Sequence, residues 1–259
     1  PFGQWQEAGL AESGLRYLLS PRVRAWIGSM RRKYRLQWPP RGSVSFGDLR
    51  RVTPVSASFG MERGRPIDRY YIEAFLEANA ADIKGRTLEL GDPFYIEKYG
   101  QGRVTQPEIL HYVEGNPLAT IVADLTDAPR IESDSFDCII FTQTLQMIWD
   151  MKAALATLHR ILKPGGVLLL TTSGISKIGR RLGRDDWGEY WRLTAPAVER
   201  LAEELFPGSD AKVMSYGNVL SANAYLQGLA LEELEPAELD YVDPDFEVIV
   251  AARIRKAVR

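Results

Sequence analysis

Thr87-Leu-Glu-Leu-Gly91 is a short apolar run that contains one acidic residue and ends in glycine. Two further apolar runs follow, Ser135-Phe-Asp-Cys-Ile-Ile140 and Leu162-Lys-Pro-Gly-Gly-Val-Leu-Leu-Leu170. Their spacing suits successive strand–helix units of a parallel sheet. An acidic residue inside the first strand, with glycine at its end, indicates a nucleoside ligand lying across the sheet.

Together these three segments resemble motifs of the class I S-adenosylmethionine-dependent methyltransferases. The resemblance implies an α/β fold, a Rossmann-like, seven-stranded and mostly parallel sheet, with S-adenosylmethionine as cofactor. Two later apolar runs, Val213–Tyr216 and Phe246–Ile254, match the antiparallel hairpin that ends this fold. Residues 45–255 resemble more closely a bacterial subgroup found beside or fused to glycosyltransferases. That likeness rests on Arg63–Tyr71, Thr142–Gln146 and Trp187–Arg192.

Composition limits the class of protein. The chain has 259 residues, 45% of them hydrophobic, and a net charge of −2 with a pI near 5.9. A net negative chain has no overall positive field for nucleic acid or an anionic membrane, so we predict no nucleic-acid partner. No run approaches the ~18 apolar residues of a membrane span, so we also predict none. The single cysteine, Cys138, cannot form an internal disulfide, which favours the cytoplasm.

The chain is predicted to contain a helical N-terminal cap, residues 1–60, and a methyltransferase domain, residues 61–259. Helical periodicity runs from Gln6 to about Arg35 and is interrupted at Ser20-Pro21, which predicts two helices. The second is rich in arginine around Trp26 and Tyr34. It is either a surface for an anionic partner or an ordinary solvated face.

The first strand and the loop after it are the expected cofactor site. Glu89 should lie on the strand and Gly91 at its end, where a missing side chain lets the backbone approach a ligand. The family's second and third glycines are replaced by Pro93 and Tyr95. Asp92 or Arg69 is predicted to supply the lost contacts, because a guanidinium fits the methionyl carboxylate. Arg69 as an ordinary surface arginine is the alternative.

The ends of the next strands should complete the cofactor site. The resemblance assigns Glu114 to the ribose hydroxyls, with His111 as substitute, and Asp124-Leu125 to the adenine. Asp124 as a helix N-cap is the alternative. The third strand is expected at residues 120–123. The interval between the second strand and this one is shorter than a parallel crossover normally needs, so the crossover helix should be truncated or displaced.

The acceptor side is predicted from polar and aromatic residues. Gln143 and Gln146 follow the fourth strand. Gln143 is predicted to contact the cofactor, and Gln146 is predicted to contact the acceptor. An insertion near residues 174–200 should also bind the acceptor, through the aromatic side chains Trp187, Tyr190 and Trp191. Core packing of the two tryptophans is the alternative. The candidate catalytic bases are His111, Asp186 and Glu189. No set of metal ligands accompanies them, so we predict no metal.

The expected function is methyl transfer from S-adenosylmethionine to oxygen or nitrogen of a small, polar, sugar-containing acceptor. This could be a glycan, an aminosugar or a glycosylated natural product. Two alternatives are a non-catalytic cofactor-fold module that partners a glycosyltransferase and a nicotinamide-dependent oxidoreductase. Lys163-Pro-Gly-Gly166 and the terminal hairpin argue against the oxidoreductase. The sequence leaves the oligomeric state open, with a homodimer as one option.

Overall fold

The structure is a computed structural model that describes residues 20–34, 39–40, 42–179 and 188–258. Contacts divide the chain into two units, residues 1–51 and 52–259. The first contains α2 (Pro21–Tyr34) and the short 3-10 helix η1 (Gly47–Leu49). Helix α2 confirms the second predicted N-terminal helix, whereas the first lies outside the described residues. That the first unit caps the second stays a prediction.

The division between the units falls before the predicted boundary at residue 60. The backbone N–H groups of Val55 and Ser56 both donate to the carbonyl of Gln227, at 2.8 and 3.0 Å. Gln227 ends α7 (Val219–Gln227) of the second unit. These hydrogen bonds explain why the extended segment after Arg51 belongs with the sheet-containing unit.

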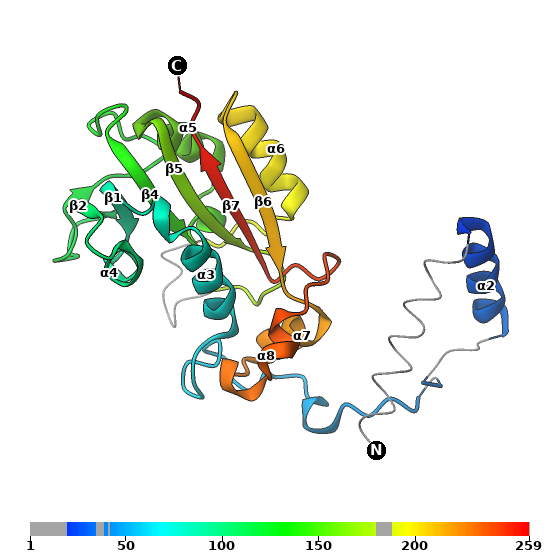
Figure 1. Cartoon of the computed structure of the whole chain (residues 1–259). Helices are drawn as coiled ribbons and strands as arrows, with labels where there is room; N and C mark the ends of the chain where they lie inside the picture. Colours follow the sequence, from blue (N-terminus) through cyan, green and yellow to red (C-terminus); the bar gives the residue numbers. More distant parts are fainter. Residues whose placement is uncertain (1–19, 35–38, 41, 180–187, 259) are drawn as a thin grey trace. The chain divides into compact units, whose positions relative to one another are not determined.

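The second unit is built on one seven-stranded sheet with the strand order β3-β2-β1-β4-β5-β7-β6 (Figure 1). Neighbours from β3 to β5 pair in parallel, and β7 pairs antiparallel with β5 and β6. The predicted fold class and its terminal hairpin are confirmed. The strands are β1 (Gly85–Leu90), β2 (Val104–His111), β3 (Ile121–Val122), β4 (Phe136–Thr142), β5 (Leu162–Ser173), β6 (Asp210–Tyr216) and β7 (Ile249–Arg255).

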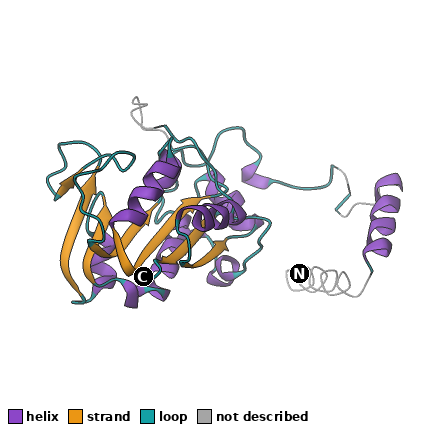
Figure 2. Cartoon of the chain, turned by 90° about the horizontal axis from the view of Figure 1, so that it is seen from above, coloured by secondary structure: helices purple, strands orange, loops and turns teal. Residues whose placement is uncertain are grey.

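Helices cover both faces of this sheet (Figure 2). One face carries α5 (Met151–Ile161) and α6 (Ala195–Leu205). The other carries α3 (Ile67–Ala78), α4 (Phe94–Gly100), α7 and α8 (Pro236–Asp240), with the 3-10 helices η2 (Ala80–Asp82) and η4 (Leu231–Glu233). A further 3-10 turn, η3 (Leu145–Met147), follows β4. Among the described helices, none has the length and hydropathy to cross a membrane.

Strand β4 shows why the sheet is buried on both sides. Ile139 and Phe141 pack in the core under α5, whereas Cys138 and Ile140 pack in the core under α3. Because successive side chains of a strand point to opposite faces, a continuous apolar run fills both cores. Cys138 is a buried free thiol, and burial raises its pKa. It is therefore a core residue rather than a nucleophile.

The crossovers on one half of the sheet are short. Helix α4 has only 7 residues. Residues 112–120, between β2 and β3, contain no helix. The predicted truncation of that crossover is confirmed. The loops after β1 and β2 therefore have little covering helix and must be held by local hydrogen bonds.

A buried lysine directly after β7 connects that strand to the end of α5 and the start of β5. The Lys256 Nζ donates to the Asp134 carboxylate at 2.7 Å and to the carbonyls of His159 and Leu162 at 2.8 and 2.6 Å. The lysine side chain is 7% exposed. Its three donors are thus all used, which satisfies the charge where water has little access.

Replacing this ammonium should unfold the protein more easily. Lys256→Met keeps the aliphatic stem but removes three buried hydrogen bonds of the ammonium, at a cost of about 2–4 kcal/mol. Urea denaturation should show this loss, and the exposed control Lys212→Met should stay within about 0.5 kcal/mol of wild type. Equal stability of both variants would contradict the assigned role.

Candidate active site

Four of the predicted cofactor and catalytic residues lie at one edge of the sheet. Leu90 pairs with Leu110, His111 with Val122, and Thr142 with Thr171. Because β1 to β5 run in parallel, their carboxyl ends share that edge. Gly91, His111, Asp124 and Gln143 lie on it or directly after it. This is the edge at which open α/β sheets bind ligands.

The backbone at Gly91 leaves room for a ligand. Gly91 has φ +86°, and a Cβ added there would meet no atom within 4 Å. Its N–H donates to the Leu110 carbonyl at 3.0 Å, and its own carbonyl accepts from the Asn116 side chain at 2.6 Å. Sequence reasoning missed Asn116, which ties the loop after β2 to the end of β1. The strand ends are thereby fixed around an open position.

The buried carboxylate of Glu89 supports the loop that follows Gly91. One oxygen accepts from the Tyr95 N–H at 3.0 Å and the other from the Ile96 N–H at 2.7 Å. Both donors belong to the first turn of α4, where backbone N–H groups otherwise lack partners. Burial raises the pKa of Glu89 to about 7. The structure thus gives Glu89 a supporting role, and direct cofactor contact stays a prediction.

The residues that replace the missing glycines lie at the start of α4, with Pro93 as its N-cap and Tyr95 in its first turn. Asp92 accepts from the Phe94 N–H at 3.0 Å, so its carboxylate stabilises the turn around Pro93. Tyr95 is buried, and its hydroxyl accepts from Arg69 Nη1 at 2.8 Å. Arg69 therefore lies beside the first loop, where the sequence predicted a partner for the methionyl carboxylate. Tyr95 therefore helps to stabilise the loop after β1, at the position where the family's glycine would leave the backbone uncovered.

Asp68, next to Arg69, is a buried acid that sequence reasoning missed. It is 8% exposed, its carboxyl hydrogen-bonds the Tyr225 side chain, and burial raises its pKa. Its Oδ1 has no hydrogen bond within the described residues. An unsatisfied buried oxygen beside an arginine fits the ammonium and carboxylate of a methionyl group. With the space at Gly91, the residues present fit S-adenosylmethionine.

The loops after β2 and β3 carry the predicted ribose and adenine contacts. Glu114 is exposed, and a ring nitrogen of His111 lies 2.8 Å from the Val113 carbonyl. Asp124 is exposed, and its Oδ1 accepts from the Thr126 N–H and hydroxyl, both at 2.8 Å. It stabilises a turn rather than capping a helix, and Leu125 is buried behind it. Both acidic groups lie on the ligand-binding edge.

A polar network joins β4 to β5 at this edge. Gln143 has φ +48°, and its Oε1 accepts from Ser173 at 2.6 Å and from Gln146 at 3.0 Å. Gln146 is 2% exposed, and its Oε1 accepts from Thr172 at 3.1 Å. The prediction that Gln146 contacts the acceptor is therefore wrong, because its side chain is buried and hydrogen-bonded internally. Its backbone carbonyl accepts from the N–H groups of Tyr190 and Trp191.

Three aromatic rings form an exposed wall beside this network. Trp149 stacks on Trp191 with ring centroids 5.3 Å apart, and Tyr190 meets Trp149 edge-on at the same distance. The Trp191 indole N–H donates to the Ile148 carbonyl at 3.1 Å. Trp149 is 67% exposed and Tyr190 50%, whereas Trp191 is half-buried. Trp149 was missed because it follows the fourth strand, far in sequence from the other two.

Glu189 is not an available catalytic base. Its carboxylate accepts from Arg192 Nη1 at 2.7 Å and from the Gly179 N–H, and its side chain is 5% exposed. Its carboxylate is committed to Gly179 and Arg192, which contradicts its candidacy as a base. Asp186 and Trp187 lie outside the described residues. Within the described ranges, no group of three or more acidic, histidine or cysteine residues is arranged to hold a metal.

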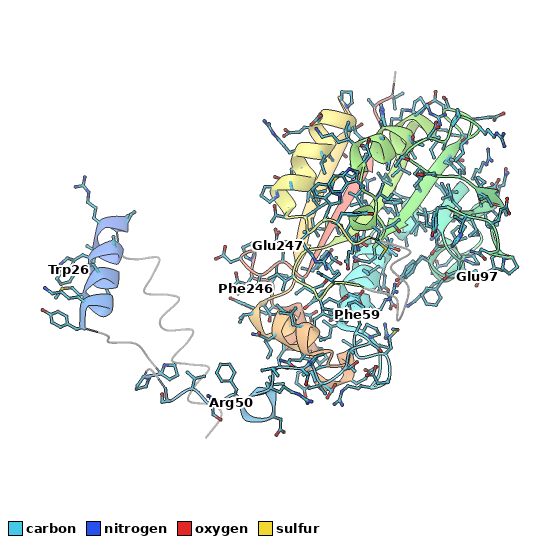
Figure 3. The ribbon with its side chains drawn as sticks, turned by 180° about the vertical axis from the view of Figure 1, so that it is seen from behind. Trp26, Arg50, Phe59, Glu97, Phe246 and Glu247 are labelled. Atoms are coloured by element: carbon cyan, nitrogen blue, oxygen red, sulfur yellow. The ribbon has the colours of Figure 1, made fainter. Side chains whose placement is uncertain are left out.

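A cavity of about 870 Å³ opens next to this insertion. Its walls come from the segment after β5, the start of α6, strand β6 and the loop before β7. The lining residues include Ile175, Arg192, Thr194, Met214 and Glu247. Glu247, labelled in Figure 3, accepts from the Ala195 N–H at the start of α6, at 3.0 Å. The insertion thus borders a hollow large enough for a small molecule.

The acidic residue of β1 gives a test of its buried, hydrogen-bonded position. The pKa of Glu89 is raised in the fold, so its stabilising contribution is present below about pH 4.5 and is lost as pH rises through about 7. A shift of that size corresponds to about 3 kcal/mol. Glu89→Gln lacks this titration and places an amide donor against a backbone N–H. The excess stability of wild type over variant in urea should therefore shrink from pH 5 to pH 8. A constant difference would contradict the assigned pKa.

Comparisons with known proteins agree with this geometry. Residues 99–170, from the end of α4 into β5, match the family model described as a methyltransferase domain. No curated protein sequence matches the chain. The fold is similar to that of the (4+2)-cyclase SpnF, at 16% identity and a TM-score of 0.50, over 76% of this chain and 85% of that one.

Two further solved structures are similar over 73% of this chain. One is an S-adenosylmethionine-dependent methyltransferase from Mesorhizobium loti, at 16% identity over 98% of that chain, with a TM-score of 0.47. The other is phosphoethanolamine N-methyltransferase 2 of Haemonchus contortus in complex with S-adenosyl-L-methionine, at 14% identity over 52% of that chain, with a TM-score of 0.48. Residues 99–170 therefore match a methyltransferase domain, and the seven-stranded sheet has the topology expected for the class I S-adenosylmethionine-dependent methyltransferases.

Proposed function

We propose that this enzyme methylates an oxygen or nitrogen of a small, polar, sugar-containing acceptor. The observation that carries the proposal is the exposed wall of Trp149, Tyr190 and Trp191 beside the carboxyl ends of β4 and β5. Flat aromatic faces bind the apolar faces of sugar rings, while the phenol and indole edges leave room for polar groups. The neighbouring cavity supplies further space, and its mixed walls include the polar residues Arg192, Thr194 and Glu247.

The residues of the chain mainly bind and orient. When bound, S-adenosylmethionine supplies a methyl group already activated on a sulfonium. Gly91, Asp124, Glu114 and Arg69 are proposed to hold the cofactor at the edge of the sheet. Gln146 holds the segment with Tyr190 and Trp191 against β5, so the acceptor meets that edge in a fixed orientation. Alignment of this kind supplies much of the rate enhancement of a transfer reaction.

The proton of the acceptor sets a further requirement. An amine acceptor needs only to arrive unprotonated, whereas a hydroxyl acceptor needs a base. His111 remains a candidate base, with its ring at the end of β2, while Glu189 is excluded by its internal ion pair. We therefore propose that an aminosugar nitrogen is a suitable acceptor atom. A cytoplasmic location is part of the same proposal.

Asp124 should be the most informative residue on the cofactor side. Asp124→Ala removes a charge-assisted hydrogen bond to the adenine amino group, worth about 1.5–3 kcal/mol, and should weaken S-adenosylhomocysteine binding at least several-fold. Calorimetry measures the dissociation constant directly. Asp127→Ala, at an exposed position on the same turn, is the control and should bind like wild type. Unchanged affinity in a folded Asp124→Ala variant would remove this residue from the site.

Trp149 tests the acceptor side with little risk to folding, because most of its ring is exposed. Trp149→Ala should lower kcat/KM for the acceptor about tenfold, since one aromatic stacking contact is worth ~1–1.5 kcal/mol. S-adenosylhomocysteine affinity should not change. Tyr241→Ala, which removes another exposed ring, is the control and should turn over normally.

The acceptor class is tested by assaying S-adenosylhomocysteine release with matched panels. One panel contains sugars, aminosugars and nucleoside diphosphate sugars, and the other contains apolar phenols and fatty acids. Turnover confined to the first panel, and reduced by Trp149→Ala, supports the proposal. Turnover confined to the second would refute it, as would loss of activity in the Tyr241→Ala control alone.

A further inference from the structure

Charge is distributed very unevenly between the two units. Residues 1–51 contain ten basic and three acidic residues, a net charge of +7. Residues 52–259 contain 22 basic and 31 acidic residues, a net charge of −9. The small net charge of the whole chain conceals this contrast. The first unit can therefore be attracted to an anionic surface that repels the second.

Helix α2 combines this positive charge with one apolar stripe. Val23, Trp26, Ile27, Met30 and Tyr34 are spaced by three, one, three and four residues. At about 100° per residue, these five positions fall within roughly a third of the helix circumference. Figure 3 shows the Trp26 side chain on this helix. The exposed fractions are 41% for Val23, 62% for Trp26 and 56% for Tyr34.

The same helix has basic residues and no acidic ones. Its sequence contains four arginines and one lysine, and no Asp or Glu occurs between Glu12 and Asp48. By helical spacing, Arg22 and Lys33 both lie about 100° or less from the centre of the stripe, on the same side of it. Both are exposed. Long basic side chains in this position can reach head groups while the stripe enters the apolar layer.

We propose that α2 binds the surface of an anionic lipid bilayer and lies in the interface without crossing it. A stripe that contains Trp, flanked by basic residues on a helix of low mean hydropathy, has the composition of interfacial helices. Nucleic acid would satisfy the charge but would leave the apolar stripe exposed to water. The helix is too short and too charged to span a bilayer. The partner is thus a membrane surface, which brings the methyltransferase unit to it.

Vesicle co-sedimentation of the full chain tests this partner. One set of vesicles contains phosphatidylcholine alone, and the other contains equal parts of phosphatidylcholine and phosphatidylglycerol. Wild-type protein should partition at least about tenfold more strongly into the anionic vesicles, because each basic residue near the surface contributes on the order of 1 kcal/mol. High salt should reduce this preference. Equal partitioning into both sets would overturn the proposal.

Matched variants separate the stripe from the charge. Trp26→Ala should reduce binding several-fold, while Phe46→Ala, which removes an aromatic side chain of similar exposure outside α2, should not. The charge reversal Arg22→Glu with Lys33→Glu should lower binding about tenfold or more. Arg130→Glu with Lys212→Glu changes the net charge equally in the second unit and should have little effect.

Two competing outcomes would overturn the proposal. If α2 packs as a cap on the methyltransferase unit, Trp26→Ala will lower the melting temperature and wild type will not sediment with anionic vesicles. If the helix binds nucleic acid instead, polyuridylate will compete fully with the vesicles and Trp26→Ala will bind it as wild type does. Measuring S-adenosylhomocysteine affinity in each variant keeps the result independent of the proposed acceptor, because that affinity should not change.

Discussion

The buried carboxylate of Glu89 is the interaction on which the cofactor edge depends. The loop after β1 has Pro93 and Tyr95 where glycines would give a flexible backbone, and α4 is too short to be stable by itself. Glu89 fixes this turn by accepting two N–H groups, and Arg69 fixes it from outside through Tyr95. With the loop held from both sides, the backbone at Gly91 stays open. Side-chain hydrogen bonds thus hold this loop where glycines would otherwise give backbone freedom.

The acceptor side is organised by a different buried group. Gln146 uses its side chain on Thr172 and Gln143, and its carbonyl on Tyr190 and Trp191. One residue therefore connects β4, β5 and the insertion. Because the partners are backbone N–H groups as well as side chains, the aromatic wall is fixed relative to the sheet rather than carried on a freely moving loop. Glu189 strengthens this arrangement by joining Gly179 to Arg192 across the insertion.

The fold could be predicted from the sequence because the strands that fill both cores are continuous apolar runs. Phe136–Phe141, with the single polar residue Asp137, and Val167–Leu170 have the pattern typical of strands in a doubly covered sheet. The site was less predictable because a polar residue can either contact a ligand or form hydrogen bonds within the protein. Glu89 and Gln146 have the residue types of ligand contacts, yet both are buried and make hydrogen bonds within the protein. Trp149, Asn116 and Asp68 could not be found, since each acts through neighbours that only the folded chain brings close.

Averages over the whole chain obscure where charge acts. A net charge of −2 argues against anionic partners only if the charge is spread evenly, and here it is divided into +7 and −9. Interactions between exposed charges are largely screened beyond about 10 Å at ordinary ionic strength, so only acidic residues closer than this to a basic helix could cancel its attraction to an anionic surface. The acidic unit instead opposes close contact of its own surface with the same bilayer.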